Sequence, residues 1–338
     1  MRRALQGYDM KVGITYDLKD DYLNEGYTPE EAAEFDSLET IDGIDEALRN
    51  LGHEADRIGN AKKLVSRLAS GDSWDLVFNI AEGMYGVGRE ALVPALLDAY
   101  RIPYTFSDPL VLSLTLHKAM TKTVIRGAGL LTADFIVVES LADVERVNLP
   151  YPLFAKPVAE GTGKGITDRS RIASKDELYT VCERLLREFH QPVLVETYLP
   201  GREFTAGVVG TGQDAQVVGV MEVLFRDRQG TDMIYSYHNK AHYEEMIVYS
   251  VPEKQIFDAC SDLALSSWKA LGCKDGGRVD IRMDASARPS FIEVNPLAGL
   301  NPVHSDLPIL SRLNGVSYQE LIERILRSTL KRIGSRAS

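Results

Sequence analysis

The stretch FIEVNPLAGL, residues 291–300, begins as an apolar strand and ends in a turn rich in Pro, Gly and Ala. Within it, Glu293 and Asn295 are two positions apart. Because side chains alternate between the two faces of a strand, both point to the same side. A carboxylate and an amide oxygen on one face suit a hard cation such as Mg²⁺. The stretch therefore predicts a strand whose exit can hold a metal ion.

The segment GGRVDIRMD, residues 276–284, precedes it and predicts the partner strand of a hairpin that turns through ASARP. The period of two places Arg278 and Asp280 on one face, and Glu293 and Asn295 can share that face on the second strand. Oxygen ligands beside an arginine suit metal-assisted chemistry on phosphates. A ladder of cross-strand salt bridges explains the same residues, so the hairpin alone leaves both interpretations open.

A glycine-rich loop in FAKPVAEGTGKGI, residues 154–166, favours the phosphate interpretation. Lys156 ends a short apolar strand, and the glycines alternate at Gly161, Gly163 and Gly165. Such a loop brings backbone N–H groups close to phosphate oxygens, and lysines add positive charge. The spacing is not that of a P-loop. A plain flexible hairpin is the alternative, and it is weakened by the metal-type cluster downstream.

The third element is VLVETYLPGREF, residues 193–204, in which Glu196 ends a buried strand and Glu203 follows a short linker. These carboxylates could accept hydrogen bonds from an adenine amino group and a ribose hydroxyl. The local pattern by itself favours two charges at the edge of a sheet.

Composition limits the class of protein. The chain has 338 residues, 44% hydrophobic and 26% charged, with a net charge of -11. An acidic balance argues against nucleic acid or a membrane surface as the partner. The three cysteines form no disulfide framework or zinc pattern, so we expect a reducing cytoplasm. No run of eighteen apolar residues occurs.

The order of elements predicts an α/β segment followed by α+β segments. Strands are expected at 10–18 and 74–80 and near IPYTFS. The first strand is not followed by G-x-G-x-x-G, which disfavours a dinucleotide-binding dehydrogenase. Helices are expected at about 90–100, 115–130, 176–190, 254–271 and 316–333. The expected domains are 1–108, 109–195 and 196–338, the last with a mobile loop at about 228–246.

Taken in order, these elements resemble the ATP-grasp superfamily. The segments at 77–108 and 293–308 further resemble the D-alanine–D-alanine ligase family, and the resemblance covers about residues 75 to 310. It implies an ATP-grasp fold with an N-terminal Rossmann-like domain. It also implies an ATP-dependent ligase that joins a carboxylate to an amine through an acyl phosphate.

The resemblance also implies roles for individual residues. The glycine loop closes over the triphosphate, and two Mg²⁺ ions bind, with Mn²⁺ as an alternative. The implied ATP-binding residues are Lys118, Lys156, Glu160, Gly161, Gly163, Glu196, Leu199, Glu203 and Lys240. The implied metal ligands are Asp280, Glu293 and Asn295, and the implied catalytic residues are Arg278, Lys240 and Thr162.

The sequence departs from the family pattern around the substrate. Asp36 or Glu39 would have to anchor the amino group, Glu82-Gly83 replaces a histidine-glycine pair, and Ala241 stands where a tyrosine is typical. The implied substrate residues are Asp36, Glu39, Glu82, Arg89 with Glu90, Arg278, Gly299, His304 and Ser305. These departures favour an amino acid with a non-standard co-substrate in specialised metabolism.

Two alternatives stay open. One is a true D-alanine–D-alanine ligase of peptidoglycan synthesis, and the other is a non-catalytic nucleotide-binding module, against which the intact Arg278 argues. The expected partners are small carboxylates and amino acids, not nucleic acid or membrane. A homodimer is expected only because family members often dimerise.

Overall fold

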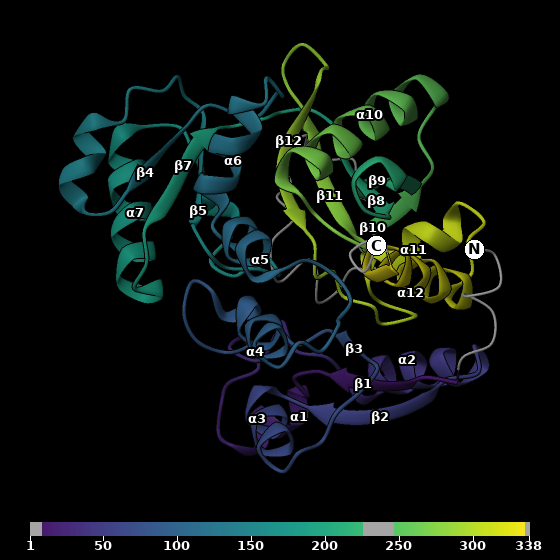
Figure 1. Cartoon of the computed structure of the whole chain (residues 1–338). Coiled ribbons are helices and arrows are strands. Elements are labelled where there is room, and N and C mark those ends of the chain that lie inside the picture. Colours follow the sequence, from purple (N-terminus) through teal and green to yellow (C-terminus); the bar gives the residue numbers. More distant parts are fainter. Residues whose placement is uncertain (1–8, 226–246, 335–338) are drawn as a thin grey trace.

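The computed structural model describes residues 9–225 and 247–334, which fold into a mixed α/β structure built on three sheets. The loop expected at about 228–246, with Lys240 and Ala241, lies outside the described residues. No helix in the described part is both long enough and apolar enough to cross a membrane. Figure 1 shows the N-terminal segment below the two other sheets.

The N-terminal sheet has the parallel order β2-β1-β3. Its strands are β1 Lys11–Thr15, β2 Glu54–Gly59 and β3 Leu76–Asn79, and its helices are α1 Lys19–Asn24, α2 Leu38–Asn50, α3 Ala61–Ala69, η1 Arg89–Ala91 and α4 Leu92–Tyr100. The carboxyl ends of parallel strands lie at one edge, which places the loops after β1 and β3 together. The strand expected at IPYTFS is only a single bridge between Val77 and Tyr104.

The helix expected at 115–130 mainly matches one helix, Lys118–Gly127, and its first two positions belong to the end of the preceding helix. Asp108 caps α5 (Pro109–Leu116) by accepting from the N–H of Val111, with proline at the first turn. His117 separates the two, and its Nδ1 accepts from the N–H of Met120 at the start of α6 (Lys118–Gly127). The side-chain cap at His117 therefore sets the start of the expected helix three residues later than predicted.

The central sheet has the antiparallel order β4-β7-β5-β6. Its strands are β4 Phe135–Val138, β5 Leu153–Pro157, β6 Arg171–Ile172 and β7 Val193–Thr197, and one face is covered by α7 Lys175–Phe189, with the short turns η2 Leu141–Arg146 and η3 Asp168–Ser170 nearby. Ser174 caps α7, and its apolar residues face the sheet. The domain division stays a prediction, and its expected boundary at 195 falls inside β7.

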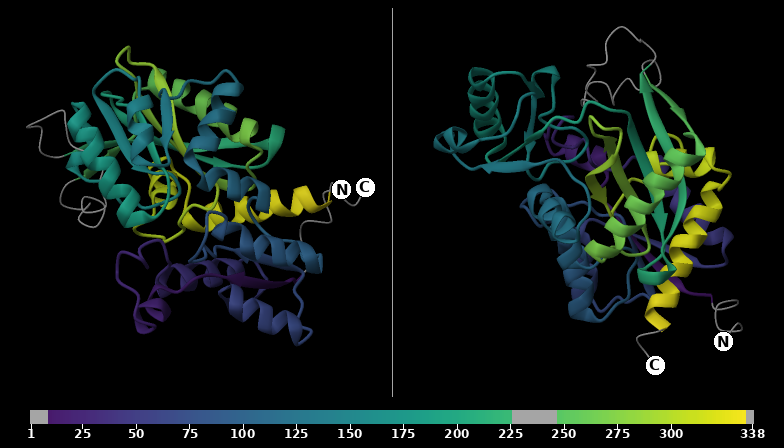
Figure 2. Two further views of the ribbon diagram at one scale, coloured as in Figure 1. Left: turned by 90° about the vertical axis from the view of Figure 1, so that its left-hand side faces the viewer. Right: turned by 90° about the horizontal axis from the view of Figure 1, so that it is seen from above.

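The C-terminal sheet has the order β10-β9-β8-β11-β12. Its strands are β8 Glu203–Val209, β9 Gln216–Phe225, β10 Ile247–Ser250, β11 Gly276–Met283 and β12 Pro289–Asn295, with the turn η4 Gly212–Asp214 and the helices α10 Lys254–Leu271, α11 Asp306–Leu313 and α12 Tyr318–Gly334. The helix expected at 254–271 is confirmed with the same bounds, whereas α11 was not expected. Figure 2 shows α12 lying between this sheet and the N-terminal segment.

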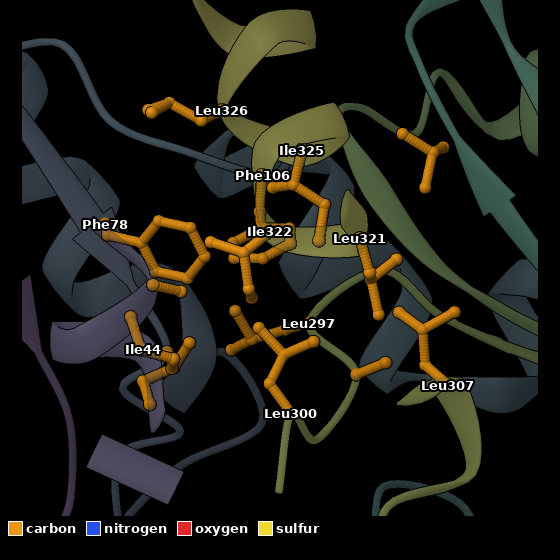
Figure 3. Packing of buried hydrophobic residues seen from close by; sticks show 14 of the residues in the cluster. Ile44, Phe78, Phe106, Leu297, Leu300, Leu307, Leu321, Ile322, Ile325 and Leu326 are labelled. Atoms are coloured by element: carbon orange, nitrogen blue, oxygen red, sulfur yellow. The ribbon is translucent and has the colours of Figure 1, made fainter. Parts of the chain in front are cut away.

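One hydrophobic core joins the N-terminal and C-terminal segments. Figure 3 shows Ile44 and Phe78 from the first packed near Leu297, Leu300 and α12 from the second. Leu297 is 2% exposed and Leu300 is 1% exposed. The apolar half of the stretch at 291–300 is therefore anchored in this core, which fixes the position of the polar half at the site.

Candidate active site

The hairpin β11–β12 forms the polar platform that its sequence predicted. Arg278 pairs across the strands with Asn295, and Asp280 pairs with Glu293. The guanidinium of Arg278 donates to Asp280, whose other oxygen accepts from Oγ1 of Thr205 at 3.0 Å. Burial lowers the pKa of Arg278, but Asp280 and Asp306 outweigh it and raise that pKa overall. The positive charge of Arg278 thus lies beside the expected metal ligands Asp280, Glu293 and Asn295.

Two lysines face the platform from the central segment. The Nζ atoms of Lys118 and Lys156 lie 3.7 Å and 3.5 Å from Oε2 of Glu293. Lys156 also lies 3.6 Å from Glu196. Burial lowers the pKa of Lys156, yet Glu196 and Glu293 raise it overall, so the lysine is held in its charged form.

A third lysine was not identified from the sequence. Lys122 is fully buried, and its Nζ lies 2.8 Å from Glu196 and donates to Oγ1 of Thr132 at 2.8 Å. Its burial lowers its pKa. Lys122 and Lys156 together neutralise Glu196 and keep its pKa low in spite of burial. Lys122 follows Lys118 by one helical turn on α6, and that spacing is the only signal that could have indicated it.

The first cavity lies between the two antiparallel sheets, which Figure 1 places side by side. It brings together five residues that were expected around ATP and two expected metal ligands: Lys156, Gly163, Glu196, Leu199 and Glu203, with Asp280 and Glu293. Glu203 is oriented by Arg282, which lies 3.4 Å away and also stacks on the ring of Tyr198. The lining combines apolar side chains with several charged groups, as a nucleotide site requires.

Of the other residues expected around ATP, Gly161 does not line this cavity, and Lys118 and Glu160 take other positions. Lys118 donates to the backbone oxygen of Glu160, and the carboxylate of Glu160 accepts from Nε2 of Gln191 at 2.7 Å. Neither lines the first cavity. Their roles toward ATP stay predictions.

The oxygen donors at the platform fit a divalent cation. No three His, Cys, Asp or Glu side chains within residues 9–225 and 247–334 converge as a ready-made metal site. Asp280 and Glu293 supply two carboxylates from paired positions, and the amide oxygen of Asn295, which accepts from the N–H of Leu297 at 3.1 Å, is the third expected donor. All three are hard donors of the kind that Mg²⁺ and Mn²⁺ prefer.

A second cavity of about 400 Å³ lies between the N-terminal segment and the loop that follows β12. Arg278 lines both cavities, so they meet at one guanidinium. The residues expected around the substrate or the loop that line it are Asp36, Glu82, Arg89, Glu90, Gly161, Thr162, Gly299, His304 and Ser305. Ser305 is positioned by the N–H of Asn301, which donates to its Oγ at 3.0 Å.

Glu39 does not line this cavity. Its Oε2 accepts from Nδ2 of Asn301 at 3.0 Å. Asp36 does line it, which favours Asp36 over Glu39 as a substrate contact.

Glu34 is the main residue that the sequence interpretation missed. Its carboxylate accepts from Arg89 at 2.9 Å and from the N–H of Gly161 at 2.9 Å, and it lies 3.3 Å from Nζ of Lys164. Burial raises the pKa of Glu34, but Arg89 and Lys164 lower it overall. Glu34 therefore ties the glycine loop to the N-terminal segment. No local pattern indicates a contact across 127 positions of sequence.

Replacing Glu34 by Gln is expected to lower kcat/KM for ATP about ten- to a hundredfold. The change removes the charge that holds Arg89 and Lys164, and hydrogen bonds to charged groups contribute about 1.5–3 kcal/mol. Steady-state kinetics with ATP as the varied substrate measures the effect. Glu30→Gln, an exposed carboxylate nearby, is the matched control. Equal kinetics in the two variants would rule out a role for Glu34 in holding the loop.

The N-terminal wall of the second cavity is acidic. Burial, followed by the charges of Glu90 and Glu34, raises the pKa of Glu82 well above its ordinary value. Burial also raises the pKa of Glu90 to about 7, although Arg89 and Lys118 pull it down. Asp36 has its pKa raised to about 7, mainly by burial. Burial and neighbouring negative charges therefore disfavour the ionised form of these carboxylates.

The raised pKa of Glu90 predicts that the stability of the fold depends on pH. The pKa of Glu90 rises from 4.5 in the unfolded chain to about 7 in the folded one. The stabilising contribution of protonated Glu90 to the free energy of unfolding is therefore fully present below pH 4.5, and it is lost as the pH rises through about 7. We expect the free energy of unfolding to fall over that window, by up to about 3 kcal/mol from this group.

Urea unfolding at a series of pH values measures this dependence. Glu90→Gln should make the slope shallower without flattening it, because Asp36 titrates in the same window. An unchanged slope in the variant would show that Glu90 is not the group responsible.

The model for the D-ala D-ala ligase C-terminus matches residues 124–327. The D-alanine–D-alanine ligase of Bordetella petrii is 31% identical over 306 residues, which cover 89% of this chain and 90% of that one. The enzyme of the same name from Bordetella pertussis is 32% identical over 305 residues, covering 89% and 92%.

Solved structures show the same fold. A D-alanine–D-alanine ligase from Bacillus anthracis complexed with ATP superposes with a TM-score of 0.71 at 21% identity, over 97% of this chain and 99% of that one. The VanG D-Ala:D-Ser ligase from Enterococcus faecalis gives a TM-score of 0.72 at 20% identity, over 95% and 100%.

Proposed function

The chain belongs to the D-alanine–D-alanine ligase family and is an ATP-dependent ligase, and on that premise we propose that it activates an amino acid's carboxylate as an acyl phosphate and joins it to an amine. The family membership and the ATP-grasp fold expected from the sequence are confirmed. The alternative of a non-catalytic module is set aside. The observation that carries the proposal is that Arg278 lines both the nucleotide cavity and the second cavity.

The proposed reaction proceeds in two steps. A carboxylate oxygen in the second cavity attacks the γ-phosphorus of ATP, and ADP leaves with the electron pair of the broken P–O bond. An amine nitrogen then attacks the acyl carbon, the C–O bond to phosphate breaks, and the ammonium proton is lost to solvent. Positioning and neutralisation of charge account for catalysis of this kind.

Residues of the chain supply that positioning. Lys156 binds phosphate oxygens, while Glu196 and Glu203 accept from the adenine and the ribose. Arg278 stabilises negative charge on the acyl phosphate and on the tetrahedral intermediate, because it is the cation that both cavities share. Glu34 keeps the glycine loop closed over the site, which excludes water from the acyl phosphate.

Asp280, Glu293 and Asn295 would hold Mg²⁺. When bound, the ion would neutralise negative charge on the phosphates beside these carboxylates. Lys118 and Lys156, within 4 Å of Glu293, balance that carboxylate from the other side.

The amino acids that are joined define two versions of the proposal. The named relatives act as D-alanine–D-alanine ligases, which favours D-alanine as a substrate. The acidic second cavity instead favours the non-standard substrate expected from the sequence. A place in specialised metabolism, a homodimer and the cytoplasm stay predictions.

Phosphate release tests the proposal. The protein is incubated with ATP, Mg²⁺ and single or paired amino acids of both configurations. Release that depends on an amino acid, together with a dipeptide detected by mass spectrometry, supports it. Release that no amino acid stimulates would contradict it.

A further inference from the structure

The acidic wall of the second cavity holds more carboxyl groups than the single ammonium group of an ordinary amino acid can pair with. Asp36, Glu82 and Glu90 all line the cavity, and all come from the N-terminal segment. Glu34 is a fourth carboxylate there, but Arg89 and Lys164 already neutralise it. Asp36, Glu82 and Glu90 form no ion pair with a basic side chain within residues 9–225 and 247–334.

Glu90 is the decisive member of this wall. It is 9% exposed, and it makes no hydrogen bond or ion pair within residues 9–225 and 247–334. The adjacent Arg89 directs its guanidinium to Glu34 and to the backbone oxygen of Ala159 at 3.0 Å. A buried carboxylate without a partner, facing a cavity, costs free energy unless a ligand neutralises it.

The C-terminal segment supplies a cation at which the activated carboxylate can bind. Arg278 on β11 lines the cavity together with Asn295 at the end of β12, Asn301 and Ser305 in the loop that follows, and Asp306, which lies 3.8 Å from Arg278. The guanidinium there suits the carboxylate that is activated. An α-amino acid bound to it would direct its ammonium group and its side chain away from Arg278, toward the acidic wall.

We propose that the amino acid activated in the second cavity is a diamino acid, whose side-chain ammonium binds at Glu90 and Glu82 while its α-ammonium binds at Asp36. This inference rests on the proposed function and names its substrate class. One α-ammonium leaves two of the three carboxyl groups without a cationic partner, whereas two ammonium groups leave one. The charges of Glu90, Glu34 and Asp36 all raise the pKa of Glu82, which shows that the group is close enough to share such a ligand.

Lys19 also lines the cavity and is the nearest competitor for this role. It forms no ion pair with any of the three carboxylates in the described part of the chain. Protonated carboxylates are the other way to relieve the repulsion, and they would show no preference for a cationic ligand.

Binding of matched pairs tests the proposal without requiring turnover. Calorimetry compares 2,4-diaminobutyrate with norvaline and ornithine with norleucine, in both configurations. The full chain is saturated with Mg²⁺ and a non-hydrolysable ATP analogue at about pH 7.5, where free carboxylates and side-chain amines are charged. Within each pair the ligands differ in charge and little in size.

We expect at least one diamino acid to bind about tenfold more tightly than its neutral partner, a difference of about 1.4 kcal/mol. Glu90→Gln should bring that ratio close to one, while Glu54→Gln, an exposed carboxylate on β2, should preserve it. Thermal melting verifies that both variants are folded. Equal binding in every pair, or a ratio that Glu90→Gln does not change, would overturn the proposal.

The result is separable from the proposed function. Turnover of D-alanine without any preference for diamino acids would overturn this inference and leave the ligase assignment intact. Preferential binding of a diamino acid without phosphate release would support this inference and contradict the proposed reaction.

Discussion

Replacing Glu293 by Gln is expected to lower kcat by about a thousandfold or more while the fold remains intact. Glu293 pairs with Asp280 on the platform and lies within 4 Å of both Lys118 and Lys156. The amide keeps the shape but loses the charge that holds a cation and balances the lysines. Amino-acid-dependent phosphate release measures the effect, and circular dichroism verifies the fold.

Two further variants make this result specific. Glu183→Gln, an exposed carboxylate on α7, should retain full activity. Glu293→Asp keeps the charge and should recover part of the loss when Mg²⁺ is raised. Activity of Glu293→Gln within about threefold of the parent would contradict the metal assignment.

Asp275→Ala is expected to destabilise the chain by about 3–5 kcal/mol. Asp275 is fully buried and accepts from the N–H of Phe106 at 2.9 Å, from Oγ1 of Thr329 at 2.9 Å and from Arg332 at 2.6 Å. It therefore fastens α12 to the segment that follows the N-terminal sheet. Removing the Asp275 carboxylate takes away the negative charge that pairs with the guanidinium of Arg332 in a buried site.

Chemical denaturation measures the loss. The backbone of Asp275 has φ of 65°, a region that Asn tolerates better than Ala. Asp275→Asn should therefore destabilise the chain less than Asp275→Ala. Equal stability of the alanine variant and the parent would show that this network does not join the two segments.

The sequence predicted the platform well because a local rule governs it. The period of two in β11 and β12 puts Arg278, Asp280, Glu293 and Asn295 on one face, and the observed register pairs them as expected. The bounds of α10 also match the helix that was expected at 254–271. Where neighbouring positions determine the structure, the sequence was sufficient.

The contacts between segments were not predictable by such rules. Glu34 reaches Gly161, and Asp275 reaches Phe106, only because separate segments dock on one another. The acidic residues of the second cavity looked like isolated departures from a family pattern until the fold placed them on one wall. Sequence spacing carries no information about these distances.

The central claim is that a carboxylate of the substrate attacks ATP, and isotope transfer tests it most directly. The protein is supplied with ATP, Mg²⁺ and an amino acid whose carboxylate oxygens are ¹⁸O, and the released phosphate is examined by mass spectrometry. The proposed reaction moves one carboxylate oxygen into each phosphate released in amide formation. Phosphate that carries no ¹⁸O, formed together with the amide product, would contradict the acyl-phosphate route.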